Sequence, residues 1–350
     1  MKRFTSLLLV LILLLGVVVG CSPKEEAPPA DSPGAEDPTD EKPDDEKPDE
    51  VIVMRLAEVH PEGYPTYEGA MEFSRLVEER TNGKYKIEVY GGSQLGDEKS
   101  VTEQIQFGAI EFGRLSLSPI TEFEKSLEVL MLPYIYRDKD HMFKVVDGEI
   151  GDELLAKLEE NKLVGLAWYD AGARSFYNSV REIKTPDDMK GLKIRVQETE
   201  LMMDLVEGLG ASPMALAYAD VYSALQTGVI DGAENNFPSY YSTHHFEVAP
   251  YLTLDEHTRI PELILTSTMV MDSLTDEEKE IFRQAAKESA ELERRLWEEY
   301  EKESEQAVIE GGVTITRLES NEEWQEKMSK IYDKYTGYEA ELIERIRNTQ

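Results

Sequence analysis

The feature that most restricts the fold of this chain is a run of 35 residues, 276–310, without a glycine or a proline. Thr275 and Glu278 form a capping box at its start, and Gly311-Gly312 follows its end. As one helix the run would be about 52 Å long, which exceeds the diameter of one lobe of such a chain. We expect its buried stripe to consist of Ile281, Ala285, Leu292, Leu296 and Trp297. A coiled-coil arm is the alternative, but no heptad persists, so the run predicts a helix that spans two lobes.

Residues 51–350 repeat a strand–helix–strand order. The near-continuous apolar run Val51–Ala57 is typical of a strand buried on both faces. Tyr67–Arg80 has an apolar stripe with helical spacing, and Tyr85–Tyr90 alternates as a half-buried strand does. Further strands are predicted at Ala109–Leu115, Leu163–Tyr169, Leu192–Val196 and Leu263–Val270. A body of this length exceeds one core, so the pattern predicts two α/β lobes with parallel sheets, whose ligands bind beyond the carboxyl ends of the strands.

The amino terminus has the form of a secretory signal. Met1-Lys2-Arg3 precedes an apolar run, Leu7–Val19, that is too short to span a bilayer of roughly 30 Å. Cys21, the only cysteine of the chain, follows Val18-Val19-Gly20. This arrangement resembles a bacterial lipobox, in which the cysteine becomes a lipidated N-terminus. The alternative is an ordinary signal peptide with an incidental cysteine; lipidation at Cys21 is the interpretation that we favour.

Residues 22–50 have the composition of a disordered tether. They contain seven prolines, twelve acidic residues and three lysines, and no aromatic residue. Such a segment has too little apolar surface to offset the entropy lost on ordering. Proline and like-charge repulsion predict an extended chain with a reach of up to about 3 Å per residue. We therefore expect the body to be held at a membrane through the lipid anchor only.

Charge and residue types exclude several classes of protein. The whole chain has a formal net charge of −34, of which residues 51–350 carry −27. A body this acidic is not expected to bind nucleic acid or anionic lipid, since both attract basic surfaces. Without a second cysteine there is no disulfide framework and no cysteine-based zinc site. The five histidines lack zinc spacing and no glycine-rich loop fits a phosphate, so neither a metal nor a cofactor is expected.

Two arginines stand in settings that restrict their role. Arg174 follows a probable strand and a glycine turn, and Arg195 lies within the apolar strand 192–196. The side chain of Arg195 is expected on the face opposite Ile194 and Val196. A buried guanidinium needs partners. These are either carboxylates of the protein, in a structural ion pair, or the carboxylate of a ligand, which the guanidinium fork binds in a bidentate way.

Several segments together resemble the solute-receptor subunit of tripartite ATP-independent periplasmic (TRAP) transporters, the DctP family. They are Gln94–Glu98, Leu132–Tyr134, Gly191–Val196, Ala211–Met214 and Asp220–Asn236, within a resemblance from about Val51 to Ile346. The resemblance implies an α/β, two-lobe periplasmic-binding-protein-like fold with a central cleft and a long helix spanning both lobes.

With that fold the chain divides into four parts. Residues 1–20 are expected to be a lipoprotein signal peptide, and residues 21–50 the lipidated cysteine and the disordered, acidic, proline-rich tether. Lobe I is expected to comprise 51–172 plus about 260–300, and lobe II 173–259 plus about 301–350.

The resemblance also implies which residues bind the ligand. Arg195 occupies the place of the strand arginine that holds the ligand carboxylate in this family. Arg174 matches a second arginine, and Asn235 matches a polar contact. The other expected contacts are Tyr218, an aromatic over the ligand, Glu98, a polar contact from the first lobe, and Arg114, His60 and Glu58 at strand ends. The arginines would neutralise carboxylates, while the other polar groups would address hydroxyls.

These residues suggest a polyhydroxylated ligand, and Gly172–Tyr177 resembles members of the family that bind hexuronates. We therefore expect a sugar acid such as glucuronate or galacturonate, with a C4-dicarboxylate as the runner-up. A metal-assisted branch that binds keto acids has an aromatic directly after the site glutamate, whereas here Asn235 follows Glu234.

The resemblance implies a receptor that catalyses no reaction. It would act outside the cytoplasm, lipid-anchored to the outer face of the cell membrane or in the periplasm. Its lobes would close on an organic anion and deliver it to separate TRAP permease subunits that use an ion gradient. Three other functions stay open: a secreted hydrolase with cleft carboxylates, a ligand-binding signalling partner, and a structural surface lipoprotein that binds no small molecule.

Overall fold

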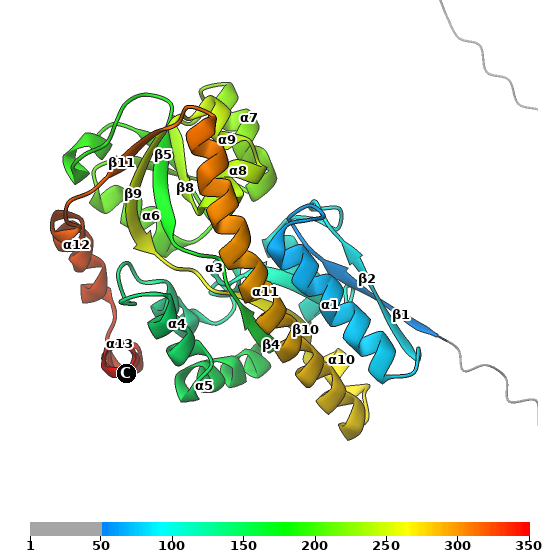
Figure 1. Cartoon of the computed structure of the whole chain (residues 1–350). Helices are drawn as coiled ribbons and strands as arrows, with labels where there is room; N and C mark the ends of the chain where they lie inside the picture. Colours follow the sequence, from blue (N-terminus) through cyan, green and yellow to red (C-terminus); the bar gives the residue numbers. More distant parts are fainter. Residues whose placement is uncertain (1–50) are drawn as a thin grey trace, which may run out of the picture. The chain divides into compact units, whose positions relative to one another are not determined.

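The computed structural model describes residues 51–350, which form two β-sheets flanked by helices (Figure 1). The signal peptide, Cys21 and the tether expected at 21–50 lie outside the described residues. We call the part built on the first sheet lobe I and the part built on the second sheet lobe II. Within residues 51–350, no helix has both the length and the apolar character that crossing a membrane requires.

Lobe I contains a five-stranded sheet in the order β2-β1-β3-β10-β4. Its strands are β1 (Ile52–Ala57), β2 (Tyr85–Tyr90), β3 (Phe112–Ser116), β4 (Leu163–Tyr169) and β10 (Glu262–Ser267). Its helical segments are α1 (Pro65–Arg80), α2 (Glu98–Gln106), α3 (Leu117–Ile120), η1 (Lys125–Met131), α4 (Lys139–Val146), α5 (Glu149–Leu158), η2 (Glu159–Asn161) and α10 (Thr268–Asp272). Phe73 of α1 and Phe112 of β3 meet edge to face in its core, where neither ring is exposed.

Lobe II contains a six-stranded sheet in the order β11-β9-β5-β8-β6-β7. Its strands are β5 (Arg174–Asn178), β6 (Lys193–Val196), β7 (Ser212–Ala215), β8 (Gly232–Asn235), β9 (Tyr251–Thr258) and β11 (Thr314–Arg317). The helical segments between and after them are η3 (Pro186–Met189), α6 (Glu200–Gly208), η4 (Tyr218–Asp220), α7 (Val221–Gln226), α8 (Phe237–Ser242), α9 (His245–Val248), α12 (Glu322–Met328), η5 (Ser329–Lys334) and α13 (Gly337–Asn348).

The expectation of parallel sheets is wrong, because each sheet contains an antiparallel strand. β1 runs parallel to β2 and β3, but β10 is antiparallel to β3, with Glu262 opposite Ser116. β5 is likewise antiparallel to β8, with Ser175 opposite Asn235. Both antiparallel strands enter directly from the other lobe. A chain that crosses at the cleft arrives beside the carboxyl ends of the parallel strands, so it has to run in the opposite direction.

Two predicted strands have different ends in the structure. The strand expected at Ala109–Leu115 starts only at Phe112. The strand expected at Leu263–Val270 ends at Ser267, whose side chain accepts a hydrogen bond from the N–H of Val270 and so starts helix α10. The apolar run continues past the strand because Val270 and Met271 of α10 are buried too.

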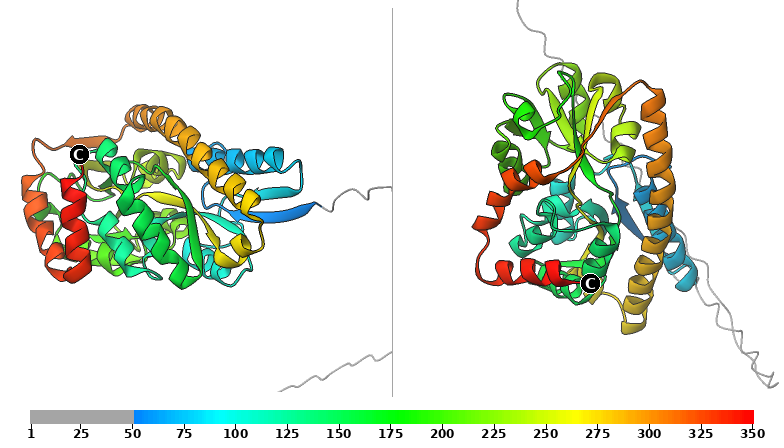
Figure 2. Two further views of the ribbon diagram at one scale, coloured as in Figure 1. Left: turned by 90° about the horizontal axis from the view of Figure 1, so that it is seen from below. Right: turned by 60° about the vertical axis from the view of Figure 1, so that its left-hand side comes forward.

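The helix predicted at 276–310 is confirmed as α11 (Asp276–Glu310). Its capping box is present, since the Thr275 side chain accepts from the N–H of Glu278, and the Glu278 carboxylate accepts from the N–H of Thr275 at 2.8 Å. α11 packs against α1 and β4 of lobe I and against α8 of lobe II (Figures 1 and 2). It is therefore the rigid element common to both lobes.

The buried stripe of α11 differs in part from the expected one. Ala285 and Trp297 are buried, but Ile281, Leu292 and Leu296 are only partly buried. The side chains on the inward face are Phe282, Ala285, Ala286, Ser289, Ala290, Glu293 and Trp297. Most are small, which lets α11 lie close to α1. A methyl group added at Gly69 of α1 would come within 2.9 Å of the Cβ of Glu293.

The last helix differs from the expected division into lobes. The sequence placed all residues after about 301 with lobe II, and α12 does contact α6 and β9 there. α13, however, packs against α5 and η1 of lobe I. Its carbonyl oxygen of Ile346 also lies 2.9 Å from Nε2 of His141 in α4. The carboxyl-terminal segment thus returns to the first lobe.

Candidate functional site

Side chains of both lobes meet where β1, β3 and β6 end. A cavity of about 260 Å³ lies there. Lobe I lines it with Val59, Glu98 and Pro119, and lobe II with Arg195, Gln197 and Tyr218. Two hydrogen bonds join the lobes nearby: Nε2 of Gln197 donates to Oγ of Ser116 at 2.9 Å, and the hydroxyls of Tyr64 and Ser239 are 2.9 Å apart. The cavity is therefore part of an interlobe cleft, and it brings together three of the residues expected from the sequence.

Arg195 is placed as the alternation of its strand predicts. Its neighbours Ile194 and Val196 are fully buried in the core of lobe II, and the guanidinium lies on the opposite face of β6. Nε and Nη2 both donate to the carbonyl oxygen of Leu216, at 2.9 and 2.7 Å. Within residues 51–350, no carboxylate lies at ion-pair distance from it. The charge of Arg195 therefore lacks a counterion in the site, and burial lowers the pKa of its guanidinium.

Arg114 is also fully buried, but its guanidinium is completely engaged within lobe I. Nε donates to Oε2 of Glu58 at 2.6 Å, Nη2 to Oε1 of Glu58, and Nη1 to Oε2 of Glu262. Nη2 also lies 2.9 Å from Nδ1 of His60. Burial works to raise the pKa of Glu58, yet Arg114 and His60 outweigh it and lower that pKa to about 2. Arg114 thus has the structural ion pairs that Arg195 lacks.

Two further carboxyl groups lie beside Arg114. Burial raises the pKa of Glu262 to about 8 against the influence of Arg114, and the charges of Glu98 and Glu58 add to that rise. Burial also raises the pKa of Glu98, whose Oε1 accepts a hydrogen bond from the N–H of Ser116 at 2.8 Å. Because Glu58 takes the ionic role, Glu262 is the group of this cluster that can hold a proton near neutral pH.

Arg174 and Asn235 belong to a second buried chain of polar groups. Nε and Nη2 of Arg174 bind the carboxylate of Glu234, and Nη1 donates to Oδ1 of Asn235 at 2.9 Å. Behind Glu234, the ring of His257 lies 3.6 Å away and also contacts Asp255 at 2.8 Å. Burial works to lower the pKa of His257, but Asp255 and Glu234 raise it to about 9. Arg174 and Asn235 do not line the 260 Å³ cavity.

The aromatic expected over the ligand, Tyr218, lies on η4 against His60. The ring of His60 stacks on Tyr64 with centroids 3.8 Å apart and meets Tyr218 edge on at 5.1 Å. Burial and the charge of Arg114 lower the pKa of His60 to about 4, so its imidazole is neutral. The Tyr218 hydroxyl is buried and has no hydrogen-bond partner in the described part of the chain.

The sequence-based list misses several residues of this region. Glu262 opens the apolar strand β10, and Glu234 lies inside β8. Both are charged residues within buried strands, the same signal that singled out Arg195. Gln197 directly follows β6, and its Oε1 is buried without a donor among residues 51–350. Its position two residues after Arg195 on one face of the strand was the available signal.

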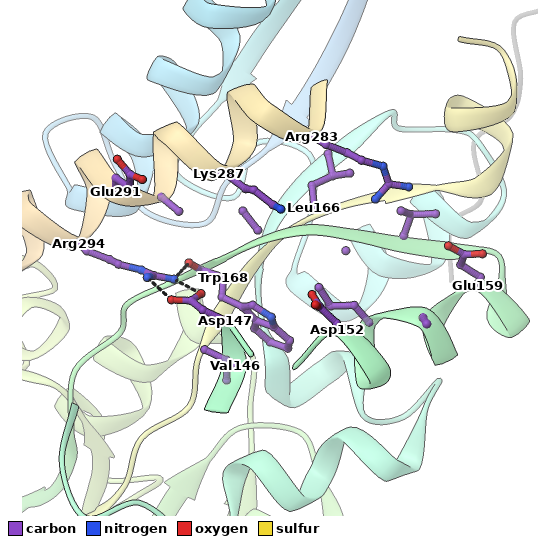
Figure 3. A pocket seen from close by; sticks show the side chains of 16 residues that line it. Val146, Asp147, Asp152, Glu159, Leu166, Trp168, Arg283, Lys287, Glu291 and Arg294 are labelled. Atoms are coloured by element: carbon purple, nitrogen blue, oxygen red, sulfur yellow. Dashed lines mark hydrogen bonds and ion pairs between the residues drawn. The ribbon is translucent and has the colours of Figure 1, made fainter. Parts of the chain in front are cut away.

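A larger cavity, of about 440 Å³, lies away from these residues (Figure 3). It is found at the outer edge of β4, between α5 and α11. Arg294 closes one end by binding Asp147 and the carbonyl oxygen of Trp168. None of the residues expected from the sequence lines it. The interlobe cleft is therefore the candidate site.

Comparison with known proteins identifies the family. The DctP model, described as bacterial extracellular solute-binding protein, family 7, matches residues 56–337. A TRAP periplasmic solute binding protein from Roseobacter denitrificans, solved with bound β-D-glucuronate, has a TM-score of 0.83 at 40% identity, over 85% of this chain and 100% of that chain. A second, from Sulfitobacter sp. NAS-14.1 with bound β-D-galacturonate, has a TM-score of 0.83 at 39% identity, over 85% and 99%. The C4-dicarboxylate-binding periplasmic protein DctP of Rhodobacter capsulatus is 32% identical over 301 residues, 85% of this chain and 88% of that protein.

These matches confirm the resemblance and the two-lobe α/β fold that were expected from the sequence. The family and its structural neighbours bind solutes for transport, and they act outside the cytoplasm. This chain belongs to the DctP family of bacterial extracellular solute-binding proteins, the solute receptors of TRAP transporters.

Proposed function

We propose that this receptor captures a hexuronate, with glucuronate and galacturonate as first candidates, through its unpaired Arg195. A buried guanidinium without a carboxylate is costly in the free protein. A ligand carboxylate would supply the missing charge and bind the guanidinium in a bidentate way. The relatives with bound β-D-glucuronate and β-D-galacturonate support this choice of ligand.

Two further side chains that line the cavity favour a ligand that carries hydroxyl groups. They are Gln197 and Tyr218, whose Oε1 and hydroxyl group are buried and have no partner within residues 51–350. Oε1 can accept from a sugar hydroxyl, and the phenol can donate to one. Glu98, whose pKa is raised by burial, lines the cavity beside them.

The other arginines favour a monocarboxylate over a C4-dicarboxylate. A second ligand carboxylate would find neither Arg114 nor Arg174 free, because both are bound to protein carboxylates. The other cation that lines the cavity is Lys99. We therefore propose that Arg114, with Glu58 and His60, shapes the lobe I wall of the site. We propose the same indirect role for Arg174, which orients Asn235. A C4-dicarboxylate stays the second candidate ligand, because the relative from Rhodobacter capsulatus is a C4-dicarboxylate-binding protein.

A ligand panel tests this proposal. We expect β-D-glucuronate and D-galacturonate to raise the Tm of the purified protein clearly, because a tight ligand stabilises the folded state by mass action. Succinate is expected to raise it less, and pyruvate least. A larger shift with succinate would favour the dicarboxylate role. Conversion of either sugar acid during incubation would point to an enzyme instead.

We also propose that Cys21 carries a lipid and that the acidic tether lets the receptor reach a TRAP permease. The lipobox-like Val18-Val19-Gly20-Cys21 and the proline-rich composition of 22–50 support this. The expected result is that Cys21→Ala shifts the protein from the membrane fraction to the soluble fraction. Unchanged membrane association of that variant would speak against lipidation.

A further inference from the structure

The chain crosses directly between the sheets at residues 170–173, which join β4 to β5, and at 259–261, which join β9 to β10. The first crossing lies against α11, the helix that packs on both lobes (Figure 2). Gly172 has φ +60°, and a methyl group there would come within 3.0 Å of Nε1 of Trp297 and 2.6 Å of Oε1 of Glu301. Movement of one lobe relative to the other must therefore change the contact between Gly172 and α11 or bend the segment 170–173.

Two fully buried acidic residues, Asp170 and Glu293, are joined at the start of this crossing through a backbone hydrogen bond. Oε2 of Glu293, on α11, accepts a hydrogen bond from the N–H of Asp170 at 2.9 Å. Oδ1 of Asp170 accepts from the N–H of Gly172 at 2.9 Å. The second oxygen of each group, Oδ2 of Asp170 and Oε1 of Glu293, is buried with no partner in the described residues. The cluster of Tyr64, Ala171 and Trp297 beside them is apolar.

An ionised pair would keep two charged oxygens without partners away from water, which is among the most costly arrangements in a protein. A single proton removes one charge and adds the hydrogen-bond donor that both oxygens lack. We propose that Asp170 and Glu293 form a proton-binding site that fastens the interlobe crossing to α11.

The surrounding charges agree with one bound proton. Burial raises the pKa of Glu293 well above its usual range, with the charge of Asp170 adding to the rise, and burial also raises the pKa of Asp170. The other charged groups that face the pair from neighbouring elements are Lys139 of α4, Arg259 and Glu262 at the second crossing, and Arg294 and Glu301 of α11. Lys139 and Arg259 favour ionised Asp170, so Glu293 is the group that keeps the proton.

Loss of the proton would place two like charges at the contact and draw in water. The crossing would then separate from α11, which favours open lobes. The sign of the pH effect follows, because the folded state binds a proton that the unfolded chain releases above pH ~4.3. The contribution to stability is complete below that pH and is lost as pH rises through the raised pKa of Glu293.

Infrared spectroscopy of the full protein without ligand tests the proton directly, so its result does not depend on the hexuronate assignment. We expect protonated carboxyl absorption at pH 7, of which Glu293→Gln removes one component while that of Glu262 stays. Glu299→Gln, an exposed change on the same helix, is expected to leave both components in place. A wild-type spectrum without a band that depends on Glu293 would mean an ionised pair and would overturn the proposal.

Thermal unfolding from pH 5 to 9 tests the coupling. Glutamine keeps the acceptor for the N–H of Asp170 and mimics the neutral acid. The Tm of wild type should therefore fall relative to Glu293→Gln by roughly 2 °C per pH unit. Glu299→Gln should keep the wild-type slope. Parallel curves for wild type and Glu293→Gln would contradict the proposal. If Glu293→Gln does not fold, Asp170→Asn is compared instead: it removes the like charge but leaves Glu293 buried, so the fall of Tm should end at a lower pH than in wild type.

Discussion

Each lobe buries an arginine at the cleft, and the two arginines have opposite surroundings. Arg114 in lobe I has carboxylates on all sides, and every nitrogen of its guanidinium is engaged. Arg195 in lobe II has one carbonyl oxygen and no protein carboxylate at ion-pair distance within residues 51–350. A buried charge with its counterion supports the fold, whereas a buried charge without one leaves a place for a ligand. The comparison therefore separates an arginine that shapes the site from one that binds.

The comparison also explains why lobe I contributes few ionic contacts. Its acids Glu58 and Glu262 are occupied by Arg114, and Glu98 is held by the N–H of Ser116. Lobe I thus offers the ligand a nearly neutral wall, while lobe II offers the positive charge. Closure would bring a polar wall over a bound carboxylate and remove water, which strengthens the ionic contact to Arg195.

The largest effect on stability should come from Arg114→Met. The change leaves the ionised Glu58 buried without its counterion, so the free energy of unfolding should fall by about 3–5 kcal/mol. Urea denaturation at pH 7 measures it. Arg55→Met, at a half-exposed arginine paired with Glu111, is the control and should cost about 1 kcal/mol or less. An equal decrease in the free energy of unfolding in the two variants would show that the buried cluster around Arg114 stabilises the fold no more than an exposed ion pair does.

A smaller, pH-dependent effect is expected for Glu262→Gln. The pKa of Glu262 is raised to about 8 in the folded protein, so its neutral form is the stable one there. Its contribution to stability is present at low pH and is lost as pH rises through 8. Relative to wild type, Glu262→Gln should therefore gain about 1 kcal/mol or more between pH 6 and pH 9 in urea denaturation. A gain toward acid pH would show that Glu262 is ionised beside Arg114 at neutral pH.

The smallest effect should come from Tyr218→Phe. The hydroxyl has no partner in the described residues, so its removal should leave the Tm of the free protein unchanged. If it donates to a ligand hydroxyl, affinity for β-D-glucuronate should fall by about fivefold, the cost of one hydrogen bond of ~1 kcal/mol. A lowered Tm in calorimetric scans would instead show that the hydroxyl supports the fold.

Local sequence pattern was sufficient for some elements. The ends of β2, β4 and α11 follow from alternation, apolar runs and a capping box, which all act over a few residues. The direction of β5 and β10 could not be read, because periodicity is the same for parallel and antiparallel strands. Direction depends on where the chain crosses between lobes, and that is set by the whole fold.

The site shows the same limit. The alternation of side chains along the strand correctly placed Arg195 on the face opposite Ile194. It could not show whether a carboxylate of the protein lies on that face. The sequence named Arg195 as the arginine that holds the ligand carboxylate and also listed Arg114, at a strand end, as a ligand contact. The placement of Glu58 and Glu262, 56 and 148 residues from Arg114 in the chain, separates them. Long-range pairing of charges decides the role of each arginine, and no local pattern contains it.

Calorimetric titration of β-D-glucuronate into wild type, Arg195→Ala and Arg195→Lys decides whether Arg195 binds the ligand. We expect Arg195→Ala to lose about 2–5 kcal/mol of binding free energy, at least thirtyfold in Kd, and to unfold cooperatively at a Tm no lower than that of wild type. Arg195→Lys should also lose most of the affinity, since a point charge cannot replace the guanidinium fork. Wild-type affinity in a folded Arg195→Ala variant would contradict the claim that Arg195 binds the ligand carboxylate.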